Sequence, residues 1–216
     1  MLRFTIFGIP TKIHWMFWAT MALLGGIGRP GMTPMGYQAV AIFVFVGFIS
    51  VLGHELGHAM TARKFGARPE ISLYFLGGLA SYPEVRMTRN QRLQVIAAGP
   101  GFGFAVALVV WLLQTFVLSD RLLGFHMIVL LWALWTINFY WSLLNILPIV
   151  PLDGGQFLGT WMNGGRLQLR SQIGTGVAAA VAVYALFNNS FFMAVMFGLL
   201  AYQNYQIGLG KRVKFF

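Results

Sequence analysis

The sequence predicts an all-α polytopic membrane protein with about six transmembrane helices and a small membrane-associated β-hairpin between spans two and three. Three observations support this fold class. Hydrophobic residues make up 58% of the chain and charged residues only 9%, against about 25% charged in a typical soluble domain. Apolar runs alternate with polar or Gly- and Pro-rich clusters. One connecting stretch carries the alternating pattern of strands.

The apolar runs have the lengths of membrane spans, which take about 20 residues each, although the first and fifth runs are short. Their expected ranges are Ile13–Ile27, Tyr37–Ala62, Leu93–Leu118, Gly124–Leu147, Ile173–Phe187 and Phe191–Leu209. Six spans within 216 residues leave room only for short connections. We therefore expect a single membrane-embedded domain over residues 1–216.

The segment Arg68–Pro83, between the second and third spans, lacks a helical pattern. Apolar and more polar residues alternate over 71–75, and Gly77-Gly78 can supply the positive φ angles of a tight two-residue turn. A β-hairpin at the membrane edge is therefore expected, with an ordinary structured loop as the alternative.

The net charge of +10 reflects topology. If the N-terminus faces the cytoplasm, only Arg29 and Arg121 lie outside, and thirteen basic residues lie inside. The inside residues are Arg3, Lys12, Arg63, Lys64, Arg68, Arg86, Arg89, Arg92, Arg166, Arg170, Lys211, Arg212 and Lys214. This positive-inside bias predicts a multi-pass protein of the plasma (inner) membrane with both termini in the cytoplasm. Its basic face suits anionic lipid, and nothing further indicates nucleic acid as a partner.

The second span contains His54-Glu55-Leu56-Gly57-His58. Helix residues four apart share one face about 6 Å apart, so both imidazoles can bind one metal ion while Glu55 reaches a water molecule. An acid at the centre of a membrane helix costs roughly 2.5–3.5 kcal/mol, so such residues usually serve a function. The alternative is a polar helix face paired with neighbouring helices.

A catalytic zinc needs a third protein ligand and an open position. The chain has no cysteine, so histidine and carboxylate are the available ligands. His54 lies nine residues before Arg63, roughly 14 Å from the cytoplasmic boundary. His126 and Asp120 border the opposite face and are therefore poor candidates.

Asp153 follows the fourth span on the cytoplasmic side. Pro148 and Pro151 break the helix before it, and Gly154-Gly155 permits a sharp turn, so Asp153 can fold back toward the histidines. Taken alone, Asp153 could instead be a residue of a helix-terminating turn.

The His54-Glu55-x-x-His58 motif, followed about ninety residues later by Asn-x-x-Pro-x-x-x-x-Asp-Gly from Asn145, resembles the site-2 protease family of intramembrane zinc metalloproteases. The resemblance implies one zinc per chain with His54, His58 and Asp153 as ligands. It also implies Glu55 as general base and Asn145 as a polar group that holds or polarises the scissile peptide. A structural interhelical hydrogen bond is the alternative role for Asn145.

Two further segments are similar to the family. Gly77-Gly78 resembles its glycine-containing membrane loop, and Ala98-Gly99-Pro100 resembles its motif at the third span. Gly103 departs from the pattern because family members often carry Asn there. The chain resembles a minimal six-span form without a PDZ or C-terminal sensing domain.

The expected function is that of an intramembrane zinc endopeptidase, a hydrolase that cuts a peptide bond within or near a transmembrane segment of a membrane-protein substrate. The alternative is a divalent-metal transporter or sensor that uses the same ligands without proteolysis. A third class is an inactive protease-like chaperone, against which the intact Glu55 argues. The sequence does not indicate the substrate, the oligomeric state or any regulatory partner.

Overall fold

The structure is a computed structural model that describes residues 1–75, 77–81, 85–118 and 123–211. Asp120, Arg121, Arg212 and Lys214, which enter the sequence predictions, lie outside this set. The chain divides into two compact units. The first comprises Met1–Arg86 and Ala98–Ser142, and the second comprises Met87–Ala97 and Leu143–Phe216.

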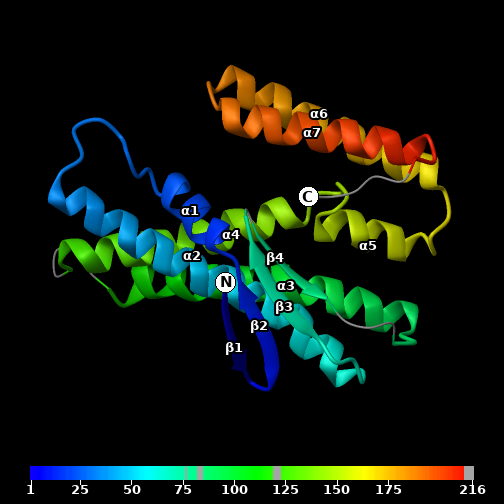
Figure 1. The fold of residues 1–216 in the computed structure, drawn as a ribbon, viewed down its shortest axis with the longest axis horizontal. Helices are drawn as coiled ribbons and strands as arrows, with labels where there is room; N and C mark the ends of the chain where they lie inside the picture. The colour runs from blue at the N-terminus through cyan, green and yellow to red at the C-terminus, as the bar shows by residue number, and fades with distance from the viewer. Residues whose placement is uncertain (76, 82–84, 119–122, 212–216) are drawn as a thin grey trace. The chain divides into compact units, whose positions relative to one another are not determined.

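The first unit combines long apolar helices with a four-stranded sheet (Figure 1). Its elements are β1 (Leu2–Ile6), β2 (Ile9–Ile13), α1 (Trp15–Leu24), α2 (Pro34–Lys64), β3 (Glu70–Tyr74), β4 (Gly77–Ser81) and most of α3 (Arg89–Phe116) and α4 (Phe125–Asn145). The strand order is β1-β2-β3-β4, with β2 parallel to β3 and the other pairs antiparallel.

The hairpin expected between the second and third spans is confirmed, but its turn was wrongly placed. Tyr74 pairs with Gly77 and Leu73 with Gly78, so Gly77-Gly78 open β4 instead of forming the turn. The chain reverses beside Phe75, which has a positive φ of 44°. Gly78 is instead needed for close packing against Glu55, as described below.

The predicted fold, all-α with one β-hairpin, was incomplete, because the N-terminal hairpin of β1 and β2 was not predicted. Phe7 (φ 49°) and Gly8 (φ 77°) form a two-residue turn between β1 and β2, as positive φ at both positions is typical of hairpin turns. Pro10 within β2 obscures this signal, since proline usually argues against an interior strand.

Four described helices are long and apolar enough to cross a membrane: α2, α3, α4 and α6 (Leu167–Phe187). Helix α1 has only ten residues, or about 15 Å at 1.5 Å per residue, which is half of a hydrocarbon core. Helix α7 (Phe191–Gly208) is not among the four, and residues 202–206, Tyr-Gln-Asn-Tyr-Gln, explain its lower apolarity. Four of the six predicted spans are therefore supported, and the first and last stay predictions.

One core cluster connects the sheet of the first unit to its helices. The residues Ile9, Ile13, Phe17, Met21, Val51, Leu52, Ala59, Ile71 and Leu73 are all buried and contact one another. The buried residues of β2 and β3 therefore pack against α2 on both sides of the motif, at Val51 and Leu52 before His54 and at Ala59 after His58. This packing fixes the sheet against the helix that carries the motif.

The second unit contains α5 (Asp153–Trp161), α6 and α7. Its core cluster includes Ile149, Ala178, Phe197 and Leu200. Helix α5 corrects a prediction, because Asp153-Gly154-Gly155 form its first turn and not a sharp reversal. Neither glycine has a positive φ. A Cβ on Gly154 would lie under 3.0 Å from the Ile146 carbonyl oxygen, so close backbone approach explains the glycines.

Candidate metal centre

His54, Glu55 and His58 lie on α2 within a buried stretch of the helix. Their exposed fractions are 3%, 5% and 8%. Thr33 caps the helix by accepting the Gly36 N–H, and Arg63 and Lys64 occupy its last turn, where cations are favoured by the helix dipole. The sequence thus places three ionisable side chains inside an apolar helix, as predicted.

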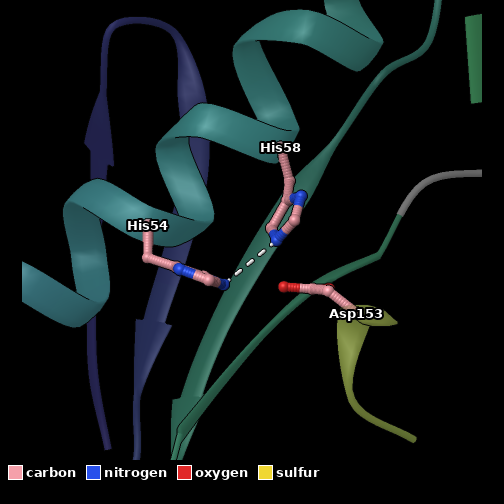
Figure 2. A group of neighbouring side chains, drawn as sticks. All are labelled: His54, His58 and Asp153. Carbon is pink, nitrogen blue, oxygen red and sulfur yellow. Dashed lines mark hydrogen bonds between the residues drawn. The ribbon is translucent and has the colours of Figure 1, made fainter. Parts of the chain in front are cut away.

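The two imidazoles converge on one point, as Figure 2 shows. Their Nε2 atoms lie 3.1 Å apart, and the ring planes meet at 79°. Two imidazole nitrogens bound to one tetrahedral zinc at about 2.0–2.1 Å lie roughly 3.3 Å from each other. The pair therefore has the spacing that a shared zinc ion requires.

Asp153 joins the histidines in the group of side chains that could hold a metal (Figure 2). One ligand atom from each of the three residues, an imidazole nitrogen or a carboxylate oxygen, lies within 4.8 Å of the other two. Two nitrogens and one oxygen form the donor set of catalytic zinc sites, which leave the fourth position open. The three residues that the sequence predicted as ligands thus form a possible zinc site.

Helix α3 packs directly against His58 because it carries a glycine, Gly99, at the point of contact. A Cβ on Gly99 would lie under 3.0 Å from Nε2, Cε1 and Cδ2 of His58, closer than real Cβ contacts allow. At the residue of α2 immediately before His58, a Cβ on Gly57 would lie 2.6 Å from the Ala98 carbonyl oxygen. The backbones of α2 and α3 therefore touch beside the imidazole, as small residues permit in membrane helices.

Strand β4 supports Glu55 in the same way. A Cβ on Gly78 would lie 2.7 Å from Cδ and Oε1 of Glu55. The carboxylate thus lies directly against the backbone of β4, at a position where glycine alone leaves room. The sequence marked this glycine as a turn residue and as part of a loop similar to one in the family, but not as a contact of Glu55, because the contact depends on how the sheet packs against α2.

A buried polar contact joins α2 to α4 one turn before His54. The amide of Asn138, 2% exposed, donates to Ser50 Oγ at 2.8 Å and to the Leu134 carbonyl at 2.9 Å. Sequence reasoning missed this pair. Polar residues inside apolar runs were the available signal, since such residues pair with one another in membrane helices.

Asn145, the remaining predicted residue, is the last residue of α4 and is half-buried. It belongs to the second unit. Nothing in the structure tests whether its role is catalytic or structural, so both interpretations of Asn145 stay open.

Comparison with known proteins agrees with the two motifs. Residues 41–124, which include His54, Glu55 and His58, match the family model of peptidase family M50. A zinc metalloprotease of Methanocaldococcus jannaschii is 29% identical over 200 residues, covering 92% of this chain and 53% of that protein. A Synechocystis protein provisionally named a zinc metalloprotease is 35% identical over 147 residues, covering 64% and 38%. The chain thus spans about half the length of these relatives, or less.

The structure is also similar to a solved one. The site-2 protease from Methanocaldococcus jannaschii aligns with a TM-score of 0.67 and 23% identity, covering 100% of this chain and 98% of that chain. This likeness shows that the fold is shared. The family match across the histidine motif and the zinc metalloprotease relatives together show that the chain is similar to peptidase family M50, and the paired imidazoles agree with that similarity.

Proposed function

We propose that the protein is an intramembrane zinc endopeptidase that hydrolyses a peptide bond within or near a transmembrane segment of a membrane-protein substrate. The observation that carries this proposal is the burial of Glu55 beside two converging imidazoles in α2, a helix long and apolar enough to cross a membrane. We assign His54, His58 and Asp153 as zinc ligands and Glu55 as general base.

The bound zinc would supply a Lewis acid that polarises the substrate carbonyl and eases deprotonation of water. Glu55 follows His54 in sequence and is therefore turned about 100° around the helix. This offset directs its carboxylate beside the ligands and not among them. Glu55 accepts a proton as the water oxygen bonds to the carbonyl carbon, and it returns that proton to the amine as the C–N bond breaks.

A substrate helix hides its amides in internal hydrogen bonds, so it must unwind before cleavage. An exposed edge strand could bind the unwound segment by strand addition. Strand β3 is not such an edge, because it lies between β2 and β4. In the described part of the chain β4 has a strand on one side only, and its Gly78 faces Glu55. We therefore assign substrate binding to β4, with Asn145 as a candidate for holding the scissile peptide.

Replacement of Glu55 by Gln tests the proposal, because Gln keeps the shape of the side chain and cannot accept the proton. Wild-type protein and Glu55→Gln are reconstituted into lipid vesicles with a single-span substrate, and cleavage and zinc uptake are measured together. We expect the variant to keep its zinc and its substrate but to lose cleavage. Glu70→Gln is the matched control, since Glu70 is exposed and pairs with Lys12 at 2.9 Å.

Two outcomes would overturn the proposal. Cleavage that survives in Glu55→Gln would exclude Glu55 as the general base. Zinc flux by the wild type without cleavage would favour the alternative, a divalent-metal transporter.

A further inference from the structure

Asn204 connects α7 to the loop that precedes Asp153. Its side chain is 1% exposed. The Val150 N–H donates to Asn204 Oδ1 at 3.1 Å, and Asn204 Nδ2 donates to the Val150 carbonyl at 2.8 Å. One carboxamide thus pairs with both the N–H and the carbonyl of Val150, which lies in a loop outside any strand or helix.

The carboxamide is itself held from several directions. Its Nδ2 also donates to the Leu200 carbonyl at 2.9 Å, which ties the side chain to its own helix. The Ser171 hydroxyl of α6 donates to the backbone carbonyl of Asn204. A Cβ on Gly174 would lie under 3.0 Å from Asn204 Oδ1, so α6 leaves room for this side chain only through a glycine. Asn204 is therefore a fixed point.

Hydrogen bonds restrain the short stretch of chain between Val150, which Asn204 binds, and Asp153. Leu152 N–H donates to the carbonyl of Ile149 at 2.8 Å, forming a tight turn around Val150. Gln156 N–H donates to the Leu152 carbonyl at 3.1 Å, and α5 begins at Asp153. Ile149 is fully buried in the core of the second unit. Any shift at Val150 would consequently reach Asp153, three residues later.

The opposite end of α5 is also held within this unit. The Arg89 guanidinium donates to the Trp161 carbonyl, and the Arg170 guanidinium packs where a Cβ on Gly159 would lie. Cations are favourable at a helix C-terminus. With its C-terminal end restrained, α5 takes its position at the N-terminal end from the loop that Asn204 binds.

We propose that Asn204 is a positioning residue of the zinc centre, which sets the place of the Asp153 carboxylate by binding both backbone groups of Val150. This inference rests on the proposed role of Asp153 as a ligand. Groups that orient a metal ligand without touching the metal typically contribute 10- to 100-fold in metal affinity. Asn204 would do so through the backbone and not through the ligand side chain.

The test measures the zinc affinity of the full-length protein in detergent, by competition with a chelating dye. The visible spectrum of the cobalt-substituted protein reports ligand geometry separately. Asn204→Ala should weaken zinc binding about 10- to 100-fold and change the cobalt spectrum. Asn188→Ala is the matched control, because the Asn188 amide also donates to the carbonyl four residues earlier, that of Tyr184 at 2.9 Å, and has no part in holding the loop. It should leave both measurements unchanged. Asn204→Asp, which keeps the size but lacks the amide donors, replaces the alanine variant if that variant does not fold.

A double variant separates this inference from the function on which it rests. If Asn204 acts through Asp153, adding Asn204→Ala to Asp153→Ala should cause no further loss of zinc affinity. Additive losses, or wild-type affinity in Asn204→Ala, would overturn the positioning role while leaving Asp153 as a ligand. Wild-type affinity in Asp153→Ala alone would instead remove the ligand assignment itself.

Discussion

The Nε2 atoms of His54 and His58 lie 3.1 Å apart on successive turns of α2. Loss of either histidine leaves only two of the three proposed protein ligands. His54→Ala or His58→Ala should therefore remove most of the zinc that copurifies with the chain, measured by mass spectrometry of the metal. Asp153→Asn keeps an oxygen ligand but loses its charge, so it should weaken binding less.

His126→Ala is the control for this measurement. His126 lies 2.8 Å from Gln38 Oε1 and does not belong to the three-residue group, so its loss should leave the zinc content unchanged. Equal zinc in all the histidine variants would mean that the metal binds elsewhere.

Gly99 and Gly101 on α3 offer a matched pair of substitutions. A methyl group at Gly99 would collide with the His58 ring, whereas one at Gly101 would meet nothing within 4 Å. Gly99→Ala should therefore displace His58 and lower zinc affinity. Gly101→Ala should keep the affinity and could raise stability by up to about 1 kcal/mol, since alanine favours helix. The same zinc affinity in both variants would contradict the close contact.

Gly78 and Gly77 on β4 make a second pair. A methyl group at Gly78 would lie 2.7 Å from the carboxylate of Glu55, whereas one at Gly77 would meet only the Trp141 ring at 3.3 Å. Gly78→Ala should move the proposed general base and lower kcat while zinc content stays at the wild-type value. Peptide hydrolysis by the two variants is the measurement, and greater loss in Gly77→Ala would refute the prediction.

The Asn138–Ser50 hydrogen bond predicts a modest effect on stability. Interhelical hydrogen bonds of this kind contribute about 0.6 kcal/mol on average and up to about 1.7 kcal/mol. Asn138→Ala, Ser50→Ala and the double variant should show a coupling energy of that size in denaturant unfolding. Simple additivity would show that the bond contributes nothing.

The pairing of Lys12 with Ser72 constrains topology, because β2 precedes α1 and β3 follows α2. Paired strands lie on one side of a membrane, so α1, α2 and the chain between them must return to that side. The positive-inside bias predicts that this side is the cytoplasm, so reporter fusions after Arg63, Arg166 and Lys211 should report the cytoplasm, and a fusion near Arg29 should report the outside. An outside signal after Arg166 would separate Asp153 from the histidines.

The sequence was sufficient to predict the three residues that form the possible zinc site, because the relevant information is local or chemically rare. His54 and His58 are four residues apart, which fixes their shared helix face. Asp153 is one of only five acidic residues, and its position after a helix end that was predicted to be cytoplasmic separated it from the others. The hairpin over Arg68–Pro83 was likewise visible from its short-range alternation.

Features that depend on contacts between distant segments were missed. The parallel pairing of β2 with β3 joins segments about sixty residues apart, and no local pattern encodes it. Gly77-Gly78 and Gly154-Gly155 were interpreted through the positive φ that glycine permits. Their actual role is to admit neighbouring atoms, which a single sequence does not distinguish from turn formation.

The order of synthesis gives the parallel β2–β3 pair a further meaning. The ribosome releases β1 and β2 first, and an isolated two-stranded hairpin is only marginally stable in water. These strands must then wait until α1, α2 and β3 have been synthesised, since Leu73 pairs with Ile13. The sheet beside Glu55 can therefore close only after the helix bearing His54 and His58 is complete. The order of the chain thus delays the assembly of this part of the centre until its motif helix exists.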